Sequence, residues 1–95
     1  MIRLFECFSS KNVCLEPNKE TEVSVYTKNI QIRDNDNISF FENFKLDDAG
    51  VHGAGTKYDG KKLYIFLLNT GESDVNVKRG EYLGNILLEE IISRE

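Results

Sequence analysis

Hydrophobic residues recur with a period of two through most of this 95-residue chain, and this period limits what the chain can fold into. In "TEVSVYTKNIQI", Val23 and Val25 fall on one face and Ser24 and Tyr26 on the other, as in a half-buried strand. "ISFFENF", "DVNVKRG" and "GEYLGNILLEEII" indicate further strands, and no segment keeps a helical period over three turns. The sequence therefore predicts an all-β fold, a jelly-roll or β-barrel of short strands.

One strand, "KLYIFLLN" (62–69), is apolar on both faces, because leucines and an isoleucine alternate with Tyr64, Phe66 and Leu68. Such a strand either lies in the centre of a closed β structure or has its outer face covered by another subunit. "TGES" (70–73) predicts a hairpin turn after this strand, and "RDNDN" (33–37) predicts a turn between two earlier strands.

The segment "DDAGVHGAGTKYDG" (47–60) holds four glycines in fourteen residues, which predicts a loop with unusual backbone positions. Backbone N–H groups in such a loop can approach a phosphate closely. Tyr58 offers a ring for stacking, and Lys57 and His52 offer hydrogen-bond donors. We therefore expect any ligand site to lie in this loop.

The length of the chain predicts a single domain, residues 1–95. Its net charge is −4, without the clustered Lys and Arg that duplex nucleic acid binding requires. No apolar run has the length of a signal peptide or of a membrane span, so the sequence predicts an intracellular protein, cytoplasmic or nuclear, with no membrane partner.

Cys7 and Cys14 are too few for a disulfide framework and lack the CxxC spacing. We expect both to be reduced and semi-buried. A Cys7–Cys14 bridge and a metal pair are the alternatives.

Two long stretches resemble the dUTPase family. "YDGKKLYIFLLNTGESDVNVKRGEYLGNILLEEI" is similar to a Tyr-x-Gly turn followed by the family's last strands, and "ECFSSKNVCLEPNKETEVSVYTKNIQI" is similar to its opening segment. The residues that match in the opening segment are Leu15, Pro17, Val25, Thr27, Ile30 and Ile32. The resemblance implies homotrimers of jelly-roll subunits that bind dUTP with magnesium between subunits and hydrolyse it to dUMP and pyrophosphate.

The family motifs carry over only in part. Tyr58 and Gly60 match the Tyr and Gly of the turn that packs on the deoxyribose. The Asp that activates the attacking water falls on Gly55, which cannot accept a proton, and the second Asp of that motif falls on Lys57. Glu81 and Asn85 match the motif near the phosphates, and Glu6 replaces the Asp that helps hold magnesium, which makes Glu6 a weak metal candidate.

Two motifs of the family are missing. An Arg-Ser turn that grips phosphate is absent between Ile32 and Gly50, where Phe40, Phe41 and Phe44 are better suited to a core or an interface. The glycine-rich C-terminal arm is absent as well. The resemblance therefore implies a pseudoenzyme without a resident cofactor, with Mg²⁺ present only if a nucleotide is bound.

These features favour a non-catalytic, dUTPase-like binding module that takes a nucleotide-like ligand or a host protein, in a viral or phage setting. Its expected ligand-binding residues are Tyr58, Lys57, Gly60, His52, Glu81 and Asn85, with the last two contributed by the same or a neighbouring subunit. One alternative is a structural or chaperone-like jelly-roll oligomer, and another is a divergent, active dUTP diphosphatase. The doubly apolar strand predicts a homo-oligomer, and the family resemblance makes it a trimer.

Overall fold

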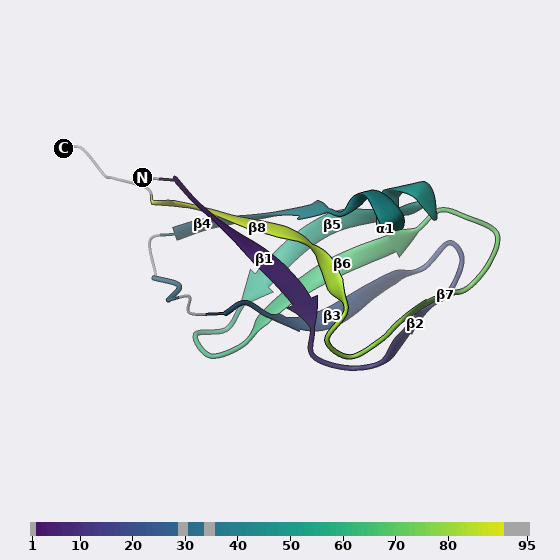
Figure 1. Cartoon of the computed structure of the whole chain (residues 1–95), viewed down its shortest axis with the longest axis horizontal. Helices are drawn as coiled ribbons and strands as arrows, with labels where there is room; N and C mark the ends of the chain where they lie inside the picture. Colours follow the sequence, from purple (N-terminus) through teal and green to yellow (C-terminus); the bar gives the residue numbers. More distant parts are fainter. Residues whose placement is uncertain (1, 29–30, 34–35, 91–95) are drawn as a thin grey trace.

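The computed structural model describes residues 2–28, 31–33 and 36–90 (Figure 1). Within these ranges the chain forms strands and one short helix, in the order β1 (Ile2–Ser9), β2 (Val13–Leu15), β3 (Glu20–Tyr26), β4 (Asp36–Glu42), α1 (Phe44–Asp48), β5 (Val51–Tyr58), β6 (Leu63–Asn69), β7 (Val75–Val77) and β8 (Tyr82–Glu90). The predicted all-β fold is confirmed. In this part of the chain, no helix is long and apolar enough to cross a membrane.

Six strands form one antiparallel sheet in the order β4-β8-β1-β3-β6-β5, and β2 pairs with β7 in a separate small sheet. The large sheet curls until its two edge strands, β4 and β5, contact each other, which makes a nearly closed barrel. We call this junction the seam. It consists of Ile38, Phe40 and Glu42 of β4 and Gly53 and Thr56 of β5.

The seam is closed by side chains that reach from one edge to the backbone of the other. The backbone N–H of Gly53 donates to Glu42 Oε2 at 3.2 Å, and the hydroxyl of Thr56 donates to the carbonyl oxygen of Ile38 at 3.2 Å. α1 connects the two edges along the chain (Figure 1). The residues at the end of the seam are therefore held from both strands and from the helix.

The core lies inside the barrel and is made by the inward faces of the strands. Val23 and Val25 of β3 are buried, as their alternation predicts, and so are Leu63, Ile65 and Leu67 of β6. β6 lies between β3 and β5, which agrees with the first of the two predicted alternatives, a strand inside a closed β structure. Its outward residues are already half-buried in a single copy, so β6 by itself does not require a partner subunit.

The prediction of a loop over residues 47–60 is wrong. Asp47 and Asp48 end α1, and residues 51–58 form β5, which pairs with β6 along its length. The glycines allow β5 to bulge and to lie close to β4. A Cβ on Gly53 would lie 2.9 Å from the ring of Phe40, and Gly55, with φ +149°, follows the register shift in β5.

The prediction of a hairpin at "TGES" is also wrong, since β6 and β7 belong to different sheets. The buried side chain of Asn69 organises this connection instead. Its Nδ2 donates to the carbonyl oxygens of Leu15 and Ser73, both at 2.9 Å, and its Oδ1 accepts from the backbone N–H of Gly71 at 2.9 Å. The predicted turn at 33–37 lies partly outside the described residues.

Both cysteines are free, and both belong to the described part of the chain. Neither is semi-buried: Cys7 lies in the core, where burial raises the pKa of its thiol to about 12, while Cys14 is exposed on β2. Of the three phenylalanines expected in a core or interface, Phe40 packs against the core. Phe41 and Phe44 are 54% and 82% exposed, so neither is a core residue.

Candidate functional site

A cavity of about 440 Å³ lies where β3 and β5 end and β6 begins, next to Tyr58. We call it the Tyr58 cavity. Its volume is in the range of small-molecule pockets. Three lysines and two tyrosines line it together with the hydroxyl side chains of three further residues: Lys11, Lys61, Lys62, Tyr26, Tyr58, Ser10, Ser24 and Thr27. This combination offers positive charge, ring faces and hydrogen-bond donors in one place.

The turn between β5 and β6 fixes one wall of this cavity. The carboxylate Oδ1 of Asp59 accepts the backbone N–H groups of Lys61 at 2.9 Å and Lys62 at 2.7 Å. These hydrogen bonds, first that of Lys62 and then that of Lys61, hold the pKa of Asp59 below its usual value. The hydroxyl of Tyr58 donates to the carbonyl oxygen of Gly60 at 3.0 Å. Tyr58 and Gly60, both expected in a site, therefore lie together in a rigid turn.

Lys57 points away from Tyr58, because adjacent residues of a strand face opposite sides. Its Nζ lies 3.3 Å from Glu22 Oε1 and 5.0 Å from the centre of the Tyr64 ring, on the outer surface of the barrel. His52 lies near the other end of β5, six residues and roughly 20 Å from Tyr58. In one copy of the chain, these three expected ligand residues therefore lie apart from one another.

Glu81 and Asn85 lie at the start of β8 and within it. Glu81 follows a turn: its N–H donates to the carbonyl oxygen of Lys78 at 3.0 Å, and Gly80 has φ +82°. Asn85 is paired with Glu6 of β1 on one side and with Phe41 of β4 on the other. The side chain of Glu81 accepts the backbone N–H of Lys78 at 3.3 Å. Neither Glu81 nor Asn85 lines the Tyr58 cavity in one copy, so their joining it across a subunit contact stays a prediction.

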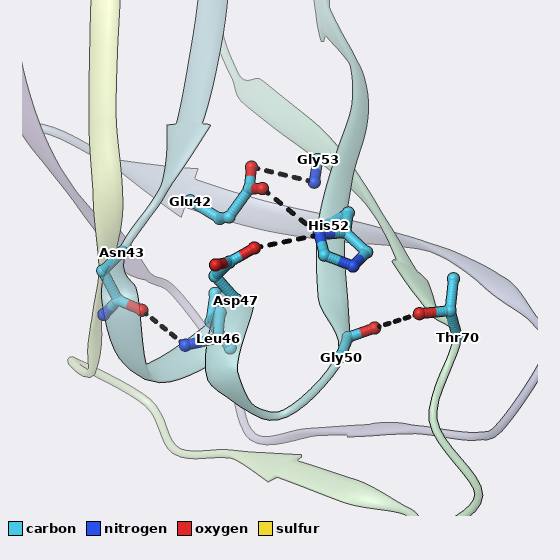
Figure 2. A network of polar contacts seen from close by, with 8 residues as sticks. All are labelled: Glu42, Asn43, Leu46, Asp47, Gly50, His52, Gly53 and Thr70. Atoms are coloured by element: carbon cyan, nitrogen blue, oxygen red, sulfur yellow. Dashed lines mark hydrogen bonds and ion pairs between the residues drawn. The ribbon is translucent and has the colours of Figure 1, made fainter.

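A second group of polar side chains gathers at the end of the seam, from three different elements (Figure 2). The Nδ1 of His52 on β5 lies 3.4 Å from Glu42 Oε1 on β4 and 3.3 Å from Asp47 Oδ1 on α1. We call these three residues the seam cluster. Within the described residues, this is the one group of three or more His, Cys, Asp or Glu with the spacing of metal ligands. Glu6 is not in such a group.

Local structure holds the seam cluster in place. Asn43 caps α1, since its Oδ1 accepts from the N–H of Leu46 at 2.8 Å, and its Nδ2 donates to the carbonyl oxygen of Tyr82 at 2.8 Å. At the other end of the helix, the hydroxyl of Thr70 donates to the carbonyl oxygen of Gly50 at 2.8 Å (Figure 2). The helix that carries Asp47 is thereby fixed to β8 and to the end of β6.

Glu42 is ionised at neutral pH. Its partial burial alone would raise the pKa of the carboxyl group, but hydrogen bonds from backbone N–H groups, including that of Gly53, and from His52 outweigh the burial and lower it. Two carboxylates therefore share one imidazole nitrogen. The sequence analysis missed this cluster, since Glu42 and His52 are ten residues apart and meet only because the edges of the sheet close on each other.

No protein-family model matches the chain, and no curated protein gives a significant match.

Proposed function

We propose that the protein is a non-catalytic, dUTPase-like binding module that takes a nucleotide-like anion in the Tyr58 cavity. The observation that carries this proposal is the lining of the cavity, with three lysines and two tyrosines on a chain whose net charge is −4. Ammonium groups and hydroxyls suit phosphate oxygens, and a tyrosine ring suits a sugar or a base. Tyr58 and Gly60 are also the two residues that match the sugar-binding turn of the dUTPase family.

The absence of catalysis rests on the residues that replace the family's acid–base set. Gly55 lies in the bulge of β5 and has no group that could activate water. Loss of a general base costs a factor of about 10² to 10⁴ in rate. The protein would therefore hold or sequester its ligand, as a viral or phage protein inside a host cell could do to a signalling nucleotide.

Replacing Lys62 by alanine should weaken dUTP binding by about 1–3 kcal/mol, the scale of a charge-assisted hydrogen bond. Titration calorimetry with dUTP, with and without Mg²⁺, measures this loss. The matched control is Lys57→Ala, which removes the same charge five residues away on the outer surface. We expect this variant to bind like the unmodified protein.

Two other results would contradict the proposal. If Lys57→Ala weakened binding as much as Lys62→Ala, the Tyr58 cavity would not be the binding site, because Lys57 lies outside it on the outer surface of β5. If the unmodified protein released pyrophosphate from dUTP at a rate on the order of 1 to 10³ per second, it would be a divergent diphosphatase.

A second candidate function, a structural oligomer, is favoured by the exposed apolar side chains on β1, β4 and β8. Ile2, Leu4 and Phe41 are 65%, 61% and 54% exposed. Leu4 is paired with Leu87 on β8, and Phe41 is paired with Asn85, so these side chains lie on the same outer face of the sheet. An apolar surface of this kind marks a contact with another protein. We propose that copies of the chain associate through it, as a trimer.

Light scattering at micromolar concentration should give a mass of about 33 kDa, three times the 10.9 kDa of one chain. Phe41→Glu should shift the protein to the monomer, because it places a charge in the apolar contact. Phe44→Glu is the control, since Phe44 is 82% exposed but lies on α1. A monomeric unmodified protein, or equal dissociation of both variants, would refute an interface on this face.

A further inference from the structure

We infer that the seam cluster is a binding site for a divalent transition-metal ion, with Zn²⁺ the best fit, and that the bound ion ties β4, α1 and β5 together. The site is separate from the Tyr58 cavity, which lies near the opposite end of β5. It also differs from the magnesium position that the dUTPase resemblance implies, which would involve Glu6. The inference therefore does not depend on the proposed function.

The donor set selects the class of ion. One imidazole nitrogen and two carboxylate oxygens suit Zn²⁺ and its neighbours among the divalent transition metals. Mg²⁺ and Ca²⁺ prefer sites made of oxygen ligands alone. The imidazole binds a metal as a neutral ligand, and each carboxylate binds with one negative charge. An ion with two positive charges therefore balances the charge of the site.

The two distances from His52 Nδ1 to the carboxylate oxygens fit a tetrahedral ion. Bonds of about 2.0–2.1 Å to Zn²⁺ place neighbouring ligand atoms about 3.3–3.4 Å apart on the edges of a tetrahedron. His52 Nδ1 lies 3.4 Å from Glu42 Oε1 and 3.3 Å from Asp47 Oδ1. All three donor atoms lie within 4.8 Å of one another. The side chains thus already have the spacing of metal ligands.

Without an ion, the hydrogen-bonding capacity of the two carboxylates is not fully met by His52. The Nδ1 atom of His52 carries at most one N–H to share between two carboxylates at nearly equal distances. Glu42 meanwhile keeps its second oxygen, Oε2, on the backbone N–H of Gly53 at 3.2 Å, which leaves Oε1 facing His52 (Figure 2). This outer hydrogen bond orients Glu42 as the supporting contacts of metal ligands do.

The site is open on one side. The side chains of His52 and Asp47 are 43% and 58% exposed, while that of Glu42 is 24% exposed. An ion can therefore enter from solvent, and a water molecule can complete its coordination as the fourth ligand. Because the three ligands come from the two sheet edges and from the helix between them, the ion would bridge the seam.

The test is a titration of the metal-free protein with Zn²⁺, followed by calorimetry and by thermal unfolding. All samples carry Cys14→Ser, which removes an exposed thiol that could compete for the ion. We expect one Zn²⁺ per chain and a rise in Tm by mass action. Mg²⁺ at the same concentration should leave Tm unchanged.

Two single variants identify the ligands. Asp47→Asn should weaken Zn²⁺ binding at least about 10-fold. Even the loss of a residue that only supports a metal ligand lowers the metal affinity about 10–100-fold. Asp48→Asn removes the same charge from the next residue of α1 and should bind like the parent. His52→Gln should lose the site, and its Tm in EDTA shows whether it still folds.

Spectroscopy separates this site from adventitious binding. Co²⁺ in place of Zn²⁺ should give the intense visible absorption of a tetrahedral ion, and NMR of the single histidine should show the metal on Nδ1. The inference is overturned if the parent does not bind Zn²⁺, if Asp47→Asn and Asp48→Asn weaken binding equally, if binding survives in His52→Gln, or if the metal lies on Nε2.

Discussion

Replacing Gly84 by alanine should lower the free energy of unfolding by about 2–6 kcal/mol. Gly84 is buried in β8 with φ +148°, a conformation that L-residues rarely adopt. A Cβ there would collide with the carbonyl oxygen of Phe41 and lie 3.0 Å from the backbone nitrogen of Asn43. The backbone strain and the overpacking each contribute about 1–3 kcal/mol, and chemical denaturation of the purified variant measures their sum.

Gly60→Ala is the control for Gly84→Ala. Gly60 also has a positive φ, +95°, but an added Cβ there would meet nothing within 4 Å. This variant therefore reports the backbone strain alone, and we expect a loss of about 1–2 kcal/mol. If the two variants lost the same free energy, β4 and β8 would not approach each other as closely at Gly84 as the structure indicates.

Asn69→Asp should also lower the free energy of unfolding, by about 3–5 kcal/mol at neutral pH, although the two side chains have the same shape. The amide Nδ2 donates to the carbonyl oxygens of Leu15 and Ser73 in a fully buried position. A carboxylate oxygen in its place would face both carbonyls without a hydrogen, and the buried charge would have no positively charged partner. Urea denaturation measures the loss against the unmodified protein.

The loss should also depend on pH, with a definite sign. Burial raises the pKa of the introduced carboxyl group in the folded state above its unfolded value of about 3.9. The part of the penalty that comes from the charge is therefore absent below the unfolded pKa and grows as the pH rises toward the folded pKa. Asn76→Asp is the matched control, because Asn76 is exposed on β7, and this variant should be close to neutral. Equal losses in the two variants at every pH would contradict the role of Asn69.

The alternation of side chains predicted the strands well where one face is buried. Val23 and Val25 point into the core as expected, and β6 takes the central place that its two apolar faces predict. The period of two is a local property, so it can be read directly from neighbouring residues. The three-residue strands β2 and β7 and the five-residue α1 are too short to show a period of their own.

The candidate site was harder to predict, because several of its residues were placed on the assumption that residues 47–60 form a loop. Treating residues 47–60 as a loop allowed Lys57 and Tyr58 to be placed in the same site, whereas a strand turns neighbouring side chains to opposite faces. The seam cluster was hidden for a different reason. His52 and Glu42 meet through the closure of the sheet, which no local pattern encodes. The signal that could have suggested α1 is Asn43, a favourable N-cap residue, followed by "FKLDD".

The seam has a consequence for solubility as well. The edge of a sheet presents unpaired N–H and C=O groups that can recruit a strand from another molecule and begin aggregation. In this barrel the N–H of Gly53 is occupied by Glu42, and the carbonyl oxygen of Ile38 is occupied by Thr56. Each edge thus shields the other with side chains, including a charged one, and does so without a continuous backbone ladder. The barrel can remain slightly open at this junction and still offer little template for the growth of a fibril.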